Sequence, residues 1–382
     1  MRLTAKQCRI FCLIAALSLA LPISLGGVTG LFLWTSPLLF LNMLLSGKGW
    51  SWFSLLGAAV LILMIMRHRW YCRWLCPTGV LCDAASIKKR LAFGPRVPRL
   101  GGVLAGLTLF AAVMGVSVLG IFDPLAIFHT FFDAFREQSL SLVLIKVAGL
   151  LLIVSINFIV PQIWCGRLCP LGGLQDAVTS VKDFLGQKGE RIVNFRRGRR
   201  MALGALFGIG LSLVFKRVVK AEATRIRPPG ALPVKIFQAT CIRCGNCAKA
   251  CPTAIIQSSF DGSNLIGLLT PFVAFTSGYC LPECTACGGV CPSGAIRPFS
   301  RQEKKTLVMG IARIEKQGCL LIEQKECDRC RFYCVYDAIT IQASKIDFSV
   351  WPEVHPERCV GCGACVLACP ARVICVDPID SK

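Results

Sequence analysis

The sequence predicts an α-helical membrane domain followed by a cysteine-rich α+β domain, and three observations support this division. Of the 382 residues, 54% are hydrophobic and only 17% are charged. The mean hydropathy of +0.61 excludes an ordinary soluble domain and a disordered chain. The long uncharged runs all lie before residue 216, whereas 17 of the 24 cysteines follow residue 240. A small disulfide-stapled secreted protein is excluded by length and hydropathy together.

Four uncharged runs in the first half predict membrane-spanning helices. They cover residues 10–47, 49–66, 100–122 and 147–164, and crossing a hydrocarbon core takes about 20 residues. The first run is too long for one span and is interrupted by Pro22 and several glycines, so it predicts one helix followed by an interfacial or re-entrant piece. A fifth, shorter run at residues 201–215 is flanked by basic residues on both sides.

The placement of charge predicts the orientation of these spans. The connectors at residues 67–99 and 161–200 each carry eight Lys and Arg, whereas the opposite connectors carry one each. The positive-inside rule therefore places the N-terminus and both basic connectors in the cytoplasm. Because the net charge of +22 is concentrated at membrane borders, nucleic-acid binding is not expected.

An internal repeat places two cysteine motifs 93 residues apart. Each copy has the form Cys-x3-Cys-Pro-x-Gly and follows a pair of predicted spans. Two such hairpins related by a pseudo-twofold axis would bring both motifs to one side of the membrane. Four thiolates are the ligand set of an iron–sulfur cluster; the alternative is redox-inert cysteines at helix ends. The additional metal ligands expected here are Cys72, Cys76, Cys165 and Cys169.

The second half holds four cysteine sets with the spacing of 4Fe–4S ligands. Two follow the bacterial pattern Cys-x2-Cys-x2-Cys-x3-Cys-Pro, in which three cysteines hold one cluster and the fourth ligates a second one. Two variant sets lengthen only the first gap. Zinc ribbons instead use two separated Cys-x2-Cys pairs. The sixteen predicted metal ligands are Cys241, Cys244, Cys247, Cys251, Cys280, Cys284, Cys287, Cys291, Cys319, Cys327, Cys330, Cys334, Cys359, Cys362, Cys365 and Cys369.

Because the fourth cysteine of each set ligates the cluster held by another set, the four sets must form two pairs. Similar spacing favours a nested arrangement, in which Cys369 joins the first set, Cys251 joins the last, and the inner sets exchange Cys291 and Cys334. Sequential pairing is the open alternative. The remaining cysteines are expected to pack as small hydrophobic side chains, and they are Cys8, Cys12, Cys82 and Cys375.

The residues around the first set carry a family resemblance. The stretch Arg227-Pro-Pro-Gly-Ala-Leu232, followed by Phe237 and the set beginning at Cys241, resembles the ferredoxin-type proteins NapG and MauM of periplasmic nitrate reduction and methylamine oxidation. The preceding spans with two Cys-x3-Cys-Pro motifs are similar to NapH (MauN) and to the NosR and CcoG families. The chain thus resembles a NapH–NapG fusion, which implies quinol-linked electron transfer. The flavin-attachment and extended periplasmic domain of NosR-like proteins are not found in the sequence.

We therefore expect an α-helical membrane domain of four or five spans followed by an α+β bacterial-type polyferredoxin domain. Residues 1–190 would form the membrane domain and residues 227–382 the ferredoxin domain. Between them, residues 191–226 hold an Arg199-Arg200 segment that resembles an internal twin-arginine signal, which would export a folded, cluster-containing domain to the periplasm. The alternative is a basic helix on anionic lipid that leaves the domain in the cytoplasm.

The connector at residues 122–137 is the best candidate for a quinol site. His129, Asp133 and Glu137 recur every four residues, so they would share one face of a helix. Interleaved phenylalanines could bury that helix in the membrane interface, and histidine can accept a proton near neutral pH. The alternative is an amphipathic interfacial helix with solvated charges.

The expected function is electron transfer in an inner-membrane, multi-pass protein, as a component of a quinol dehydrogenase. Electrons would pass from quinol through four 4Fe–4S clusters, with a further cluster at the repeat, to a periplasmic cytochrome or a terminal reductase or dehydrogenase. An alternative is an accessory iron–sulfur protein for maturation or redox maintenance of another metalloenzyme. A redox sensor is a third class, but no DNA-binding or kinase pattern accompanies the cysteines.

Overall fold

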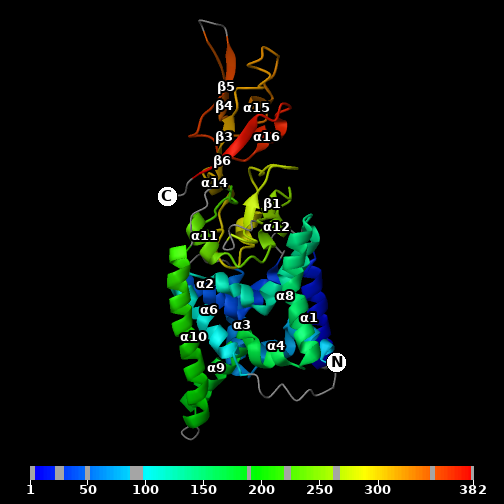
Figure 1. The fold of residues 1–382 in the computed structure, drawn as a ribbon, viewed down its shortest axis with the longest axis vertical. Coiled ribbons are helices and arrows are strands. Elements are labelled where there is room, and N and C mark those ends of the chain that lie inside the picture. The colour runs from blue at the N-terminus through cyan, green and yellow to red at the C-terminus, as the bar shows by residue number, and fades with distance from the viewer. Residues whose placement is uncertain are drawn as a thin grey trace.

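The computed structural model describes residues 5–21, 30–47, 52–86, 98–186, 191–218, 225–260, 267–344 and 349–379. A bundle of helices forms one end of the molecule, and a smaller domain of short strands and helices is stacked on the other end (Figure 1). The bundle helices are α1 (Ala5–Ala20), η2 (Leu31–Thr35), α2 (Pro37–Ser46), α3 (Ser54–Met66), α4 (Trp70–Trp74), α5 (Pro77–Ala85), α6 (Gly101–Val113), η4 (Val118–Phe122), α7 (Pro124–Asp133), η5 (Ala134–Arg136), α8 (Leu140–Ile159), the π-helix η6 (Trp164–Leu168), α9 (Pro170–Gly186) and α10 (Arg191–Val218).

The predicted internal repeat extends beyond the cysteine motifs. In each half a short 3-10 helix leads into an N-cap residue, a proline in the first turn and a ten-residue helix, and these helices are α2 and α7. The two N-caps meet, because Ser36 Oγ donates a hydrogen bond to Asp123 Oδ2 over 2.6 Å. The prediction that residues 10–47 divide into a helix and a separate piece is confirmed: α1 ends at Ala20 and α2 begins at Pro37.

Among the described residues, one helix is long and apolar enough to cross a membrane by length and composition. This helix is α8, with 20 residues. The other apolar helical stretches, in α1, α2, α3, α6 and α10, have 10 to 14 residues. The number of membrane spans therefore stays a prediction.

Helix α10 packs along α6 through two glycines. A Cβ atom on Gly204 would come within 2.0 Å of the Val103 carbonyl oxygen, and one on Gly208 within 2.5 Å of that of Leu107. Small residues at four-residue spacing allow such close helix packing in membrane proteins. The helix has 28 residues, many more than the uncharged run at residues 201–215, because the flanking basic residues continue it at both ends.

A bulky side chain at Gly204 should separate α10 from α6. We expect Gly204→Leu to lower the free energy of unfolding by about 1–3 kcal/mol or more, the cost of overpacking a tight contact. Thermal unfolding of the detergent-solubilised protein measures this effect. Gly210→Leu is the matched control, since no described residue lies within 4 Å of a Cβ on this glycine of the same helix. Equal unfolding temperatures for both variants would contradict the packing role of Gly204.

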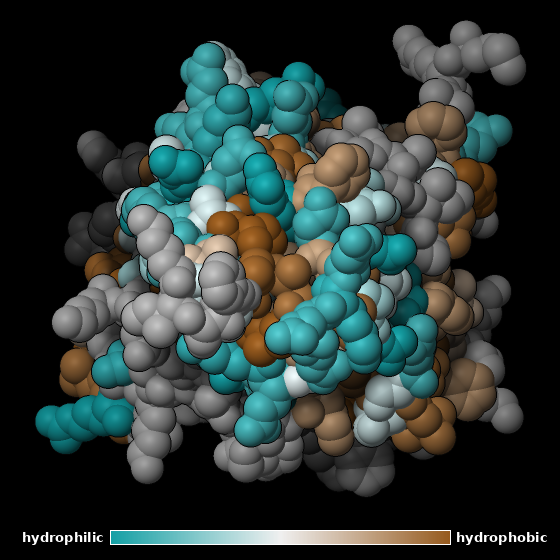
Figure 2. Space-filling model, turned by 90° about the horizontal axis from the view of Figure 1, so that it is seen from above, coloured by the Kyte–Doolittle hydropathy of each residue, from teal (hydrophilic) through white to brown (hydrophobic). Residues whose placement is uncertain are grey.

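The smaller domain consists of two modules built on three two-stranded antiparallel sheets. Its elements are α11 (Val234–Thr240), α12 (Asn246–Ala250), β1 (Ile256–Ser258), β2 (Pro271–Val273), α13 (Ala286–Gly289), α14 (Arg301–Lys304), β3 (Gly310–Ile314), α15 (Arg329–Phe332), β4 (Ile339–Ala343), β5 (Val350–Val354), α16 (Ala364–Ala368) and β6 (Ile374–Pro378). Strand β1 pairs with β2 in the first module, and β3 with β6 and β4 with β5 in the second. Viewed from this end, hydrophilic side chains surround a small apolar area (Figure 2).

Candidate iron–sulfur sites

The first module brings its eight cysteines into two groups of four. Cys241, Cys244 and Cys247 line one cavity together with Cys291, the last cysteine of the second set; we call this group site I. Conversely, Cys251 lies near Cys280 and Cys287, and both of these cysteines also lie near Cys284. This group is site II, and its members are Cys251, Cys280, Cys284 and Cys287.

The second module repeats this exchange. One cavity is lined by the first three cysteines of the third set and the last of the fourth, and we call it site III: Cys319, Cys327, Cys330 and Cys369. Another cavity holds the first three cysteines of the fourth set and the last of the third, and we call it site IV: Cys334, Cys359, Cys362 and Cys365.

The nested pairing predicted from similar spacing is therefore wrong, and the sequential alternative describes the molecule. The reason is local folding: Cys251 and Cys369 directly follow the short helices α12 and α16, and these helices pack on α13 and α15 of the adjacent sets. A crossover within such a compact module needs only a short chain between the two sets, whereas nesting would have required the first and last sets to pair across more than 100 residues.

The four groups fit iron–sulfur clusters. Burial raises the pKa of the Cys287 thiol to about 12 and that of Cys330 to about 11, so a strongly positive metal core is needed to keep these sulfurs as thiolates. Backbone N–H groups already point at ligand sulfurs, from Ala312 to Cys359 over 3.4 Å and from Ala338 to Cys334 over 3.2 Å. Four cysteine side chains around one cavity are the ligand set of a 4Fe–4S cluster.

A buried lysine adjoins site II. Lys304 is 2% exposed, and its Nζ donates to Cys280 Sγ over 3.1 Å and to the Cys284 carbonyl oxygen over 3.2 Å. Hydrogen bonds and charges at the ligating sulfurs set the reduction potential of a cluster. Since reduction adds negative charge, an ammonium group here stabilises the reduced state.

Replacing Lys304 with methionine should lower the reduction potential of the site II cluster. A one-electron potential falls by about 60 mV for each ~1.4 kcal/mol of lost stabilisation, so we expect a drop of this order in a redox titration followed by EPR. The adjacent Lys305 is exposed, and Lys305→Met provides the control. Unchanged potentials in Lys304→Met would show that the ammonium group does not influence the cluster.

Sites II and IV connect the two modules. The backbone N–H of Cys280 donates to the Cys362 carbonyl oxygen over 2.8 Å. Tyr336 lies between them, and the sulfurs of Cys362 and Cys280 both contribute, after burial, to raising its pKa to about 12. The sites thus follow one another in the order I, II, IV and III, with site I nearest the helical bundle.

The repeated Cys-x3-Cys-Pro motifs also meet. All four cysteines line one cavity in the bundle, and we call this group the repeat site: Cys72, Cys76, Cys165 and Cys169. The two halves hold their second cysteines in the same way, because the Gly79 N–H donates to Cys76 Sγ over 3.3 Å and the Gly172 N–H to Cys169 Sγ over 3.5 Å. The predicted convergence of the motifs is confirmed; cluster binding there remains a proposal.

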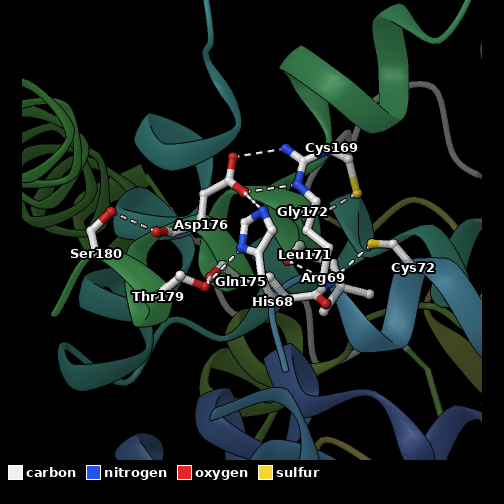
Figure 3. Close-up of polar contacts among 10 residues, drawn as sticks. All are labelled: His68, Arg69, Cys72, Cys169, Leu171, Gly172, Gln175, Asp176, Thr179 and Ser180. Carbon is white, nitrogen blue, oxygen red and sulfur yellow. Dashed lines mark hydrogen bonds and ion pairs between the residues drawn. The ribbon is translucent and has the colours of Figure 1, made fainter. Parts of the chain in front are cut away.

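Each half of the repeat also contacts the first cysteine of the other half. Gln175 Nε2 donates to Cys72 Sγ over 2.9 Å (Figure 3). The position equivalent to Gln175, 93 residues earlier, is Cys82, which is fully buried and hydrogen-bonded to Cys165. Cys82 is buried, as expected for a packing role, and it also places a fifth thiol beside the repeat site. The alignment of the two repeat copies already placed Cys82 opposite Gln175, but only the structure shows that both point across the pseudo-twofold axis.

Polar pairs surround the repeat site with the same symmetry. Arg69 donates two hydrogen bonds to the Asp176 carboxylate, over 2.8 and 2.7 Å (Figure 3). The equivalent Gln162 donates to Asp83 over 3.2 Å. Arg69 and Gln162 also share a left-handed backbone conformation, with φ of 50° and 56°. These matched contacts lock the two halves together on either side of the four cysteines.

Helix α7 links the repeat site to site I. Pro124, its first residue, lines the cavity of the repeat site and accepts a hydrogen bond from Thr78 over 3.0 Å. At the other end, Thr130 donates to the Arg243 carbonyl oxygen over 3.3 Å, and Asp133 lies against Gly245, both within the first cysteine set. Ten helical residues cover about 15 Å, so one short helix separates the two sites.

The predicted quinol residues lie where α7 meets the ferredoxin domain. His129 and Asp133 share α7, but the helix ends at Asp133 and Glu137 follows the turn η5, so the three do not lie on one continuous helix. Lys146 of α8 instead joins the carboxylates, 2.5 Å from Asp133 Oδ2 and 2.5 Å from Glu137 Oε1, and donates to Ser258 of the ferredoxin domain over 2.7 Å. Sequence reasoning missed Lys146 because a lone lysine within an apolar run gives no signal of its partners.

His129 is poorly placed to receive a proton from a membrane substrate. Its side chain is fully buried, and neither ring nitrogen has a hydrogen-bond partner among the residues that the structure describes. Burial first, and then the nearby Lys249, lower the pKa of His129 well below its ordinary value. Lys249 itself covers the helix, donating to the carbonyl oxygens of Ala20 and His129 over 3.1 Å each.

Comparisons with known proteins agree with these sites. Three families described as 4Fe-4S domains match the chain: a dicluster domain at residues 325–373, a binding domain at residues 234–257, and a second binding domain at residues 49–93 and again at 143–192, once for each copy of the repeat. The dicluster match covers most of sites III and IV together, in keeping with sequential pairing. No solved structure matches the chain.

Several curated proteins are similar to the chain. The methylamine utilization ferredoxin-type protein MauM of Methylorubrum extorquens is 36% identical over 43% of this chain and 76% of its own length. The ferredoxin-type protein NapG of Escherichia coli is 30% identical over 48% of this chain and 82% of its own length. NapF of the same organism is 30% identical over 39% of this chain and 82% of its own length.

Proposed function

The chain belongs to the family of ferredoxin-type proteins that includes MauM and NapG, and as such it is an iron–sulfur electron-transfer protein. From this premise we propose that it takes electrons from membrane quinol at its helical bundle and delivers them singly to a periplasmic redox partner. Quinol yields two electrons and two protons, whereas each 4Fe–4S centre accepts one electron at a time. A row of one-electron sites therefore suits this conversion.

The placement of the bundle in a membrane is supported by its surface. Large apolar side chains are exposed on its outer helices, among them Leu152 of α8 at 61%, Leu206 of α10 at 67% and Ile62 of α3 at 59%. Such a surface is expected to face lipid rather than water. We propose that α1, α3, α6, α8 and α10 span the membrane, with α2 and α7 as shorter helices between them.

The periplasmic side is proposed for the ferredoxin domain. The repeat site lies within the two basic connectors, which the positive-inside rule assigns to the cytoplasm. The ferredoxin domain contacts the opposite end of α7 and α8, through Thr130 and Lys146. Helix α10, with Arg199 and Arg200 near its start, runs the length of the bundle toward this domain (Figure 1).

The observation that carries the proposal is the connection made by α7. One end of this helix lines the repeat site and the other contacts site I, so the repeat site, sites I, II, IV and III form one row from the bundle to the tip. At the tip, beside site III, Phe332 is 80% exposed and Tyr333 is 52% exposed. We propose this end as the place where electrons leave the protein.

Quinol reduction of the purified holoprotein tests the function. Under anaerobic conditions, a short-chain quinol should reduce the ferredoxin-domain clusters of the wild-type protein in lipid nanodiscs, as followed by EPR. In Cys169→Ala, quinol should no longer reduce them, whereas dithionite still should. A wild-type protein that dithionite reduces but quinol does not would refute the proposed donor, and full quinol reduction in Cys169→Ala would refute the route.

A further inference from the structure

A polar cavity lies directly beside the repeat site. Its volume is about 400 Å³, within the range of about 300–1,000 Å³ typical of small-ligand sites. Three residues line both this cavity and that of the four cysteines, namely Arg69, Gln162 and Gly166. Since Gly166 follows Cys165 in the chain, a ligand here would be separated from the repeat site by a single layer of residues.

The lining of the cavity offers several hydrogen-bonding side chains. His68 belongs to the wall; its Nδ1 lies 2.9 Å from Thr179 Oγ1, and its Nε2 lies 3.8 Å from the Asp176 carboxylate (Figure 3). The side chain of His68 is 52% exposed, in contrast to the buried His129. Arg99 and Arg167 add guanidinium groups to the lining, which are hydrogen-bond donors for an oxygen atom of a ligand.

The surroundings of the cavity suit a ligand with an apolar tail. His68 and Arg69 follow the end of α3, where Met66 is 66% exposed, and Val160 of the lining follows the end of α8, where Phe158 and Ile159 are each 58% exposed. A polar cavity next to apolar, lipid-facing helix ends matches an amphipathic molecule whose head group is polar and whose tail stays in the membrane.

We propose that this cavity binds the head group of the membrane quinol, with His68 and Arg99 as binding residues. The inference rests on the proposed function and replaces the connector around His129 as the quinol site. His68, whose ring nitrogens lie near Thr179 and Asp176, accepts a hydrogen bond from one hydroxyl group of the quinol. Arg99 donates to an oxygen atom of the same head group.

Binding of a fluorescent hydroxyquinoline N-oxide, an analogue of quinol, tests this site. The full-length holoprotein is titrated in nanodiscs of neutral phosphatidylcholine, and the quenching of fluorescence reports the dissociation constant. Losing one hydrogen bond to the head group should raise this constant about tenfold in His68→Leu and in Arg99→Gln. His68→Gln keeps a hydrogen-bonding side chain and should recover part of the affinity.

Two other histidines provide controls. His129→Leu and His355→Leu should bind the analogue like the wild-type protein, and all variants should match it in iron content and unfolding temperature. Wild-type binding in both His68→Leu and Arg99→Gln, or a loss confined to His129→Leu, would overturn the proposal. If quinol then still reduces the wild-type clusters, only this cavity is refuted; if quinol fails to reduce the wild-type protein, the proposed function itself fails.

Discussion

Replacing Cys291 with alanine should remove the same cluster as replacing Cys247. Both sulfurs line site I, so each variant should lose on the order of four irons per chain and the same EPR signal. Cys369→Ala should instead match Cys330→Ala, because those two cysteines share site III. Iron analysis and EPR of the dithionite-reduced proteins measure these losses.

The control for this experiment is a cysteine outside all five sites. Cys375 lies on β6, where its thiol donates to the Arg313 carbonyl oxygen over 3.7 Å, and Cys375→Ala should keep every cluster signal. The decisive comparison is between Cys369→Ala and Cys247→Ala. If these two variants lost the same signal, the pairing would be nested and the sequential arrangement would be wrong.

Replacing Lys146 with methionine should strongly destabilise the junction between the bundle and the ferredoxin domain. The Lys146 and Asp133 side chains are only 1% and 2% exposed, and Glu137 is 14% exposed. Removing the ammonium group leaves a buried carboxylate without its counter-charge, which typically costs about 3–5 kcal/mol. We therefore expect a lower free energy of unfolding, measured by thermal or denaturant unfolding of the solubilised protein.

A second substitution separates the buried charge from the loss of packing. Asp133→Asn combined with Lys146→Met removes both charges, and this double variant should recover most of the lost stability. Lys182→Met is the matched control, because Lys182 is exposed and its hydrogen bonds to the carbonyl oxygens of Ile65 and Met66 are long, at 3.4 Å each. If Lys146→Met were as stable as Lys182→Met, the buried ion pair would not hold the junction.

The ligand sets could be predicted because cluster ligation depends on local spacing. Three cysteines two residues apart wrap one cluster whatever the rest of the chain does, so Cys241, Cys244 and Cys247 follow from the sequence. The choice of the fourth ligand does not, because it depends on which helices pack together. Similar spacing suggested Cys369, whereas the packing of α12 on α13 brings in Cys291.

The repeat likewise has features that the sequence predicts and contacts that only the tertiary structure shows. Its 93-residue offset predicted that Cys72, Cys76, Cys165 and Cys169 would converge, and they do. The offset also aligned Cys82 with Gln175, but a lone cysteine gives no sign of the sulfur it will contact. Only the pseudo-twofold packing of the two halves decides that each of these side chains reaches the opposite motif.

By itself, the sequence determined the family, the cysteine sets and the division of the chain, because these depend on spacing, composition and local motifs. The tertiary structure decided the order of the sites, the enclosure of His129 beneath the ferredoxin domain, and the role of Lys146 as the counter-charge of two carboxylates. Each of these is a contact between segments distant in sequence, where a side chain's partner is chosen by packing and by the need to pair buried charge. The same packing left His68, rather than His129, beside a cavity next to the repeat site.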